Sequence, residues 1–106
     1  MREISISHQI IGDNHPTCIV FECGPTHNGL SSAKKLVDLA SNSGVSCVKF
    51  QMLSADRLVS DKNKLFKYSI LLNKEDEEVL DIEEPLHAIL KRRELSREEW
   101  KELAKY

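Results

Sequence analysis

The sequence predicts an α/β protein in which two parallel strands are joined by a helix, and three observations support this prediction. Residues 17–23 form a nearly continuous apolar run, which is typical of a parallel strand covered on both faces. Residues 30–43 then repeat their apolar side chains with the period of a helix, and residues 45–52 return to a strand pattern. The connection is too long for a hairpin and suits a right-handed crossover between parallel strands.

The chain is long enough for one small domain and not for two. It has 106 residues, of which 41% are hydrophobic, so a core is possible. With a formal net charge of -2, the chain lacks the excess of positive charge that is typical of proteins that bind nucleic acid or an anionic membrane. No apolar stretch approaches the roughly 20 residues of a transmembrane helix, and the N-terminus lacks the apolar centre of a signal peptide. A cytoplasmic location is therefore expected.

The N-terminal segment is expected to form a strand or a short hairpin. Residues 4–11 alternate in part between apolar and polar side chains. Residues 12–16 contain glycine, aspartate, asparagine and proline, which are typical of a turn. The β-α-β unit follows, with a loop expected over residues 24–29.

The helix predicted over residues 30–43 has one apolar stripe. Its apolar residues recur at positions i, i+3, i+4 and i+7 from Ala33 to Ala40, which places them on one face. Gly44 is positioned to end this helix in a left-handed cap.

The second half of the chain has weaker signals. Residues 53–74 mix polar and apolar side chains without a clear period. Residues 75–84 hold seven acidic residues in ten positions. We interpret them as a solvated surface segment, ordered or disordered, rather than as a metal site.

Two helices are expected near the C-terminus. Pro85 suits the first turn of one helix, and the basic residues 91–93 lie near its end, where the helix dipole favours cations. This basic trio is interpreted as a helix terminus rather than a binding patch. The next helix is predicted to begin at Ser96, which forms a capping box with Glu99.

The cysteines are interpreted as small core residues. There are three, Cys18, Cys23 and Cys47, and an odd number without a CxxC spacing argues against a disulfide framework or a zinc knuckle. Cys18 and Cys23 would be roughly 16 Å apart on one strand, which is too far for a disulfide.

Polar side chains gather where the two predicted parallel strands end. Side chains alternate between the faces of a strand, so Glu22 ends one face of the first strand, and Lys49 and Gln51 end one face of the second. Parallel neighbours end at the same edge of a sheet, so these three side chains should converge. A charge buried there is costly without a partner or a function.

Two interpretations of this convergence stay open. Glu22 and Lys49 could form a buried ion pair with a structural role only. Alternatively, they could belong to a binding site, because ligands of parallel α/β folds bind at the carboxyl ends of the strands. His27 by itself is more often an ordinary loop residue, and Asn28 with Gly29 forms a routine turn.

Three segments resemble the beginning of the sialic acid synthase family, whose members are also called N-acetylneuraminate synthases. They are FECGPTHNG, AKKLVDLASNSGVSCVKFQ and LSREEWKELAKY, and VKFQ after a glycine-ended helix is the sharpest motif. The likeness runs from about residue 12 to the last residue. It is specific over residues 17–52 and 95–106 and loose over residues 60–94.

The resemblance implies a fold for the whole chain. Residues 1–106 would be the N-terminal fragment of a (β/α)₈ TIM barrel, with a strand or hairpin first, then the β-α-β unit and then helices. The later strands of the barrel and the family's C-terminal antifreeze-like domain would be absent. The chain alone is therefore expected to be inactive.

The resemblance also implies a reaction. Enzymes of this family condense phosphoenolpyruvate with an N-acylated amino sugar, such as N-acetylmannosamine or its 6-phosphate, and release phosphate. A divalent metal, manganese or magnesium, assists, and its ligands are expected outside this chain. These small molecules are the expected partners, without nucleic acid or membrane.

By the same resemblance, individual residues receive roles. Glu22 corresponds to the glutamate near the sugar carbonyl, Lys49 would hold an anionic group of phosphoenolpyruvate, and Gln51 would hydrogen-bond substrate. His27 and Asn28 are further candidate substrate-binding residues. The motif usually has asparagine where this chain has Thr26, so the role of that position does not carry over. The alternative is a non-catalytic module that associates with itself or a partner through an exposed sheet edge.

Overall fold

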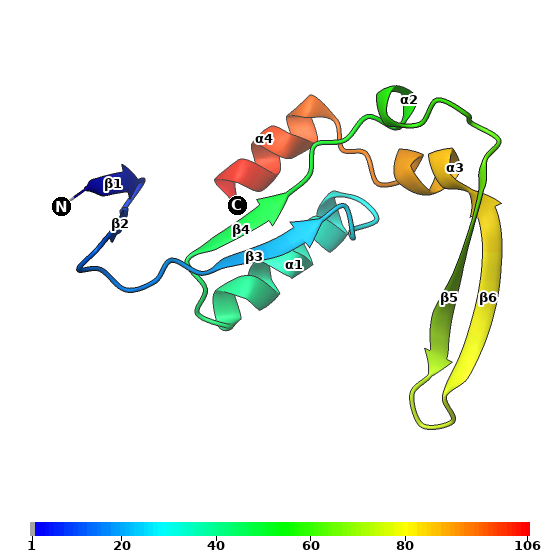
Figure 1. Ribbon diagram of the computed structural model, residues 1–106, viewed down its shortest axis with the longest axis horizontal. Helices are drawn as coiled ribbons and strands as arrows, with labels where there is room; N and C mark the ends of the chain where they lie inside the picture. The colour runs from blue at the N-terminus through cyan, green and yellow to red at the C-terminus, as the bar shows by residue number, and fades with distance from the viewer. Residues whose placement is uncertain (1) are drawn as a thin grey trace.

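The computed structural model describes residues 2–106 and contains both strands and helices (Figure 1). Met1, which the expected domain includes, lies outside the described residues. In chain order the elements are β1 (Glu3–Ile6), β2 (Gln9–Gly12), β3 (Val20–Gly24), α1 (Leu30–Asn42), β4 (Cys47–Phe50), α2 (Ala55–Leu58), β5 (Leu65–Asn73), β6 (Glu78–Pro85), α3 (Leu86–Lys91) and α4 (Arg97–Lys105).

The predicted β-α-β unit is confirmed. β3 and β4 pair in parallel, with Glu22 opposite Lys49, and α1 connects them. The helix ends after Asn42, and Gly44 has a φ of 76°, the left-handed conformation expected of a glycine at this end. The α/β class predicted from sequence is therefore correct for this part of the chain.

The N-terminal segment forms a hairpin, as expected. β1 and β2 are antiparallel, with Ile4 opposite Ile11. The turn predicted over residues 12–16 follows β2 and contains a hydrogen bond from the His15 N–H to the Gly12 carbonyl (3.1 Å). Figure 1 shows this hairpin set apart from β3 by an extended connection.

The acidic residues 75–84 are solvated, as expected, and most of them belong to an ordered strand. β6 pairs antiparallel with β5 in a long hairpin that extends away from the helices (Figure 1). Cross-strand partners explain why an acidic segment is ordered here. Ser69 donates a hydrogen bond to Asp81 (2.6 Å), and the Lys67 ammonium lies 3.8 Å from the Glu83 carboxylate.

The two C-terminal helices begin where the sequence indicates. Pro85 ends β6 and is the N-cap of α3 rather than a residue of its first turn. Ser96 caps α4: its side chain accepts from the Glu99 N–H (3.1 Å), and the Glu99 carboxylate accepts from the Ser96 N–H (2.7 Å). The predicted capping box is therefore confirmed. α4 is joined to α1 by an ion pair between Lys34 and Glu102 (2.6 Å).

Buried side chains are few, and the molecule is open in shape. Its radius of gyration is 17.6 Å, whereas a compact domain of this length has about 13 Å. Its accessible surface is 8309 Å², whereas a compact protein of this mass exposes about 6,000 Å². The hydrophobic residues that are buried are Cys23, Ala33, Ala40, Ala55, Val59, Ile89 and Leu103.

The expectation that β3 is covered on both faces is wrong for the described chain. Val20 and Phe21 point to opposite faces of β3 and are 50% and 42% exposed. The helices cover only part of this small sheet, so the apolar run has no second layer on it. The expectation of three core cysteines is correct only for Cys23, because Cys18 and Cys47 are half-buried.

Candidate functional site

Glu22 and Lys49 meet at the carboxyl ends of β3 and β4. They are register partners, and the Lys49 ammonium lies 2.6 Å from Glu22 Oε2. The convergence predicted from strand alternation is therefore correct for this pair. The expectation that the pair is buried is wrong, because 49% of the Glu22 side chain and 61% of the Lys49 side chain are exposed. Solvent can therefore reach both groups, and so can a ligand.

Gly24 shapes the edge beside this pair. Its φ is 51°, and the pairing of β3 with β4 shifts register between Glu22 and Gly24. The turn brings the Gly24 N–H to the second carboxylate oxygen, Glu22 Oε1, at 2.9 Å. The carboxylate therefore accepts from an ammonium on one side and from a backbone amide on the other, which fixes its orientation.

Gln51 approaches the same point. A Cβ atom on Gly24 would lie 3.5 Å from Glu22 Oε1 and 3.9 Å from Gln51 Nε2. Gln51 also lines a hollow of about 390 Å³ that continues to Arg57 in α2. The structure therefore gathers Glu22, Lys49 and Gln51 at one sheet edge, next to an open hollow.

The charge state of this site follows from its contacts. The hydrogen bond from Lys49, followed by its charge and the Gly24 N–H, lowers the pKa of Glu22 below its ordinary value of 4.5, although partial desolvation opposes the shift. Glu22 is thus ionised near neutral pH and can accept hydrogen bonds. Lys49 is held in place by Glu22 while its side chain stays more than half exposed, so its ammonium can also meet an anionic ligand.

His27 lies elsewhere. It is completely buried, and its ring meets the rings of Phe50 (6.0 Å between centroids) and Trp100 (6.1 Å) edge-on. Phe50 follows Lys49 directly in β4, so its side chain points to the opposite face of that strand. His27 can thus affect a ligand at Lys49 only by positioning the loop that holds Asn28.

The loop itself is ordered by His27. The Gly29 N–H donates to His27 Nδ1 (3.3 Å), so the proton of the neutral ring is on Nε2. Burial, followed by the charge of Arg93, lowers the pKa of His27. Asn28 is exposed at the surface of this loop. The substrate-binding roles expected for His27 and Asn28 stay predictions.

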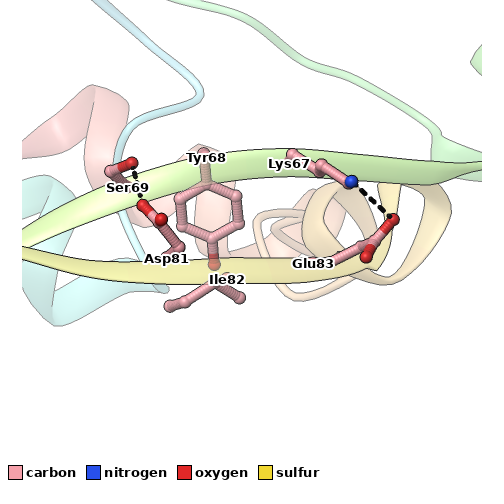
Figure 2. Close-up of a pocket in the computed structure, with 6 residues that line it drawn as sticks. All are labelled: Lys67, Tyr68, Ser69, Asp81, Ile82 and Glu83. Carbon is pink, nitrogen blue, oxygen red and sulfur yellow. Dashed lines mark hydrogen bonds and ion pairs between the residues drawn. The ribbon is translucent and has the colours of Figure 1, made fainter.

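A larger hollow, of about 450 Å³, lies on the β5–β6 hairpin (Figure 2). Figure 2 shows that its polar side chains face one another across the two strands: Ser69 meets Asp81, and Lys67 meets Glu83. All six lining residues come from these two strands, so no other described element closes the hollow around a ligand. The sheet edge at Glu22 and Lys49 is the better candidate.

The described residues do not form a metal centre. Within residues 2–106, no three histidine, cysteine, aspartate or glutamate side chains are grouped as ligands. We therefore assign no metal-dependent step to these residues. No helix in the same part of the chain is long and apolar enough to cross a membrane.

Sequence reasoning missed two features of the site. The Gly24 amide supports the carboxylate, and the only signal for it is the Glu-x-Gly spacing that precedes the turn. Arg57 reaches the hollow because a single helical turn follows β4, and four residues are too few to give a periodic pattern.

Comparison with known proteins shows that the sequence matches a protein family. A family profile described as the NeuB family matches residues 36–106. This match includes Lys49 in β4 and Gln51, which follows β4, and it continues to the last residue. It begins after β3, so Glu22 lies outside the matched segment.

Three curated relatives resemble the chain. N,N'-diacetyllegionaminic acid synthase of Campylobacter jejuni is 40% identical over 76 residues, which are 71% of this chain and 23% of the relative. Spore coat polysaccharide biosynthesis protein SpsE of Bacillus subtilis is 37% identical over 68 residues, or 63% of this chain and 18% of the relative. An uncharacterised protein of Methanocaldococcus jannaschii is 31% identical over 85 residues, or 79% and 25%. The chain thus spans about a quarter or less of these relatives.

Proposed function

Because this chain belongs to the NeuB family of sialic acid synthases, we propose that it supplies part of the active site of an enzyme that makes a sialic acid-type nonulosonate. The reaction would condense phosphoenolpyruvate with an N-acylated amino sugar, such as N-acetylmannosamine or its 6-phosphate, and release phosphate. The names of two relatives, a diacetyllegionaminic acid synthase and a spore coat polysaccharide biosynthesis protein, support this class of product.

One observation carries the proposal: Glu22 and Lys49 are paired in register at the carboxyl ends of two parallel strands. That edge is where α/β enzymes place their substrates. In the proposed fold, β3 and β4 are the first two strands of a (β/α)₈ barrel. The exposed face that holds this pair would then point to the barrel mouth.

Lys49 is proposed to bind an anionic group of phosphoenolpyruvate. Its ammonium is 2.6 Å from Glu22, and the Lys49 side chain is 61% exposed, so it can keep this contact and bind a second anion. A compact ammonium with three donors suits a phosphate or carboxylate oxygen. Gln51, which approaches the same point, would donate a hydrogen bond to the same ligand or to the sugar.

Glu22 is proposed to act at the sugar carbonyl. It is ionised near neutral pH, so it can orient a water or a hydroxyl by accepting its hydrogen bond. When bound, a divalent metal would supply Lewis-acid polarisation of the sugar carbonyl. The described residues form no ligand set for it, so its ligands would come from outside them.

The proposal is tested first by binding. Phosphoenolpyruvate should shift the backbone amide signals of residues 47–51 in an NMR titration of the 106-residue chain. Lys49→Ala should abolish these shifts, whereas Lys101→Ala, which removes an exposed lysine of α4, should not. Shifts that persist unchanged in Lys49→Ala would contradict the assignment of Lys49.

The second test is turnover. We propose that this chain alone does not release phosphate from phosphoenolpyruvate in the presence of manganese and N-acetylmannosamine, because two strands enclose no barrel interior. A phosphate assay with the purified chain checks this. Measurable turnover by the 106 residues would overturn the inactivity, while leaving the identity of the reaction supported.

A second candidate function is association without chemistry, and the open surface favours it. Among the described residues, β3 and β4 form a sheet of only two strands with much apolar surface exposed. An unpaired strand edge is a template for pairing with another copy. Sedimentation distinguishes the two: a monomer with a cooperative thermal transition would count against edge pairing.

A further inference from the structure

A cavity of about 310 Å³ lies between the base of the β5–β6 hairpin and α3. This volume is at the lower end of the range for small-molecule pockets, about 300–1,000 Å³. None of its lining residues belongs to the Glu22–Lys49 site. Four of its lining residues are apolar, one is a tyrosine and one is an arginine: Phe66, Leu86, Ile89, Leu90, Tyr68 and Arg93.

Arg93 lacks an acceptor in this cavity. Its Nε is buried without a hydrogen-bond partner, and within residues 2–106 its guanidinium forms no ion pair. A buried donor without an acceptor is unfavourable, and it is more so when the group is charged. Arg93 therefore offers this cavity a buried donor that an acceptor from outside the described residues could satisfy.

A nearby carboxylate does not fill this role. Glu84 already accepts from Arg92 at both oxygens (2.8 and 2.6 Å) and from the Tyr68 hydroxyl (2.6 Å). Arg92 and Glu84 thus form a bidentate ion pair, in which their charges neutralise each other. Within the described residues Arg93 forms no ion pair with Glu84, although its charge helps to lower the pKa of Glu84.

His27 also has a buried donor without a partner among the described residues, but it does not line this cavity and adds no negative charge near it. Its Nδ1 accepts from Gly29, so Nε2 carries the proton, and this nitrogen is buried without a partner in the described residues. Arg93 is near enough to contribute to the lowered pKa of His27.

We propose that this cavity binds a small organic monoanion, with an apolar body against Phe66, Leu86 and Leu90 and a carboxylate on Arg93. The guanidinium fork matches a carboxylate, and the apolar walls match an aromatic or aliphatic body. One unpaired cation balances one charge, which favours a monocarboxylate over a multiply charged phosphate. This ligand class differs from both substrates of the proposed reaction.

Phenylacetate and phenylacetamide are the probes that test this proposal, because they share a shape and differ in charge. Titration of the 106-residue chain by NMR should give shifts at residues 66–68 and 86–93 with phenylacetate. Contacts between the ring protons of phenylacetate and Leu86 or Leu90 should appear as intermolecular nuclear Overhauser effects. Phenylacetamide should bind at least about tenfold more weakly, a difference of about 1.4 kcal/mol.

Two arginine variants complete the test. Arg93→Gln should remove the preference for the carboxylate, so that both probes bind equally weakly. Arg97→Gln, which removes an exposed arginine of α4, should keep the preference. If Arg93→Gln does not fold, the comparison of the two probes on the natural chain still decides.

Three results would overturn the proposal. The first is equal affinity of the natural chain for both probes. The second is absence of shifts at the cavity at about 10 mM phenylacetate, a Kd that corresponds to only about −2.7 kcal/mol. The third is an equal loss of the carboxylate preference in the Arg93→Gln and Arg97→Gln variants. Shifts confined to residues 47–51 would place the anion on Lys49 instead, and would equally reject this cavity.

Discussion

Lys49 Nζ lies 2.6 Å from Glu22 Oε2 across two parallel strands, and both side chains remain about half exposed. An exposed ion pair of this kind contributes little to stability. The pair fixes the ammonium at the sheet edge while leaving donors free. This relationship underlies the proposed role of Lys49.

The first prediction concerns the titration of Glu22. Lys49 is the largest cause of its lowered pKa, so Glu22 should titrate below 4.5 in the natural chain and closer to 4.5 in Lys49→Met. Carboxyl ¹³C shifts followed by NMR from pH 7 to pH 2 measure both values. Because the folded pKa is the lower one, the stabilising contribution of the pair is present above pH 4.5 and is lost as the pH falls.

Lys101→Met is the control for this titration. It removes an exposed lysine from α4 and should leave the Glu22 pKa unchanged. If Lys49→Met and Lys101→Met gave the same Glu22 titration as the natural chain, the ion pair would not exist in solution.

The second prediction concerns Gly24. Its φ of 51° is unfavourable for residues with a Cβ, while the nearest atoms at 3.5 and 3.9 Å leave room for a methyl group. Gly24→Ala should therefore lower the free energy of unfolding by about 1 kcal/mol through the backbone alone. Gly24→Asn should cost less, because asparagine tolerates this conformation. Urea unfolding measures both, and equal losses would argue against a backbone cause.

The β-α-β unit was predictable because its signals are local. The stripe from Ala33 to Ala40 requires only the helical period, and Gly44 requires only its place after the last turn. Strand alternation then placed Glu22 and Lys49 at one edge without any knowledge of distant residues. The same logic applied to Ser96, whose partner is three residues away.

The features that sequence reasoning missed depend on distant partners. The acidic run at residues 75–84 looks like a solvated segment until Ser69 and Lys67 are placed opposite Asp81 and Glu83. The exposure of Glu22 was missed because the apolar run around it suggested a second covering layer, which the described chain lacks. The burial of His27 depends on Trp100, which is 73 residues away in sequence.

The third prediction concerns the α4 capping box. Ser96→Ala should lower the free energy of unfolding by about 1 kcal/mol, because the Glu99 N–H loses its acceptor. Ser31→Ala is the matched control: Ser31 is exposed in the first turn of α1, where alanine is a good helix former. Chemical denaturation compares the two. A loss in Ser31→Ala as large as that in Ser96→Ala would show that the cap is not the cause.

The last prediction concerns the pH dependence of the hairpin base. Arg92 and the Tyr68 hydroxyl lower the pKa of Glu84 from 4.5 to about 2. Because this folded pKa lies below the unfolded one, the stabilisation is complete above about pH 4.5 and disappears as the pH falls toward 2. The urea midpoint of the natural chain should therefore fall between pH 6 and pH 2.5 by more than that of Arg92→Gln.

Arg97→Gln separates this effect from a general loss of positive charge. Arg97 is exposed in α4, so its variant should follow the natural chain across the whole pH range. Tyr68→Phe should fall between the natural chain and Arg92→Gln, because Arg92 is the larger cause and the phenol the second. Parallel pH profiles for the natural chain and Arg92→Gln would mean that the Glu84–Arg92 pair does not hold the hairpin to α3.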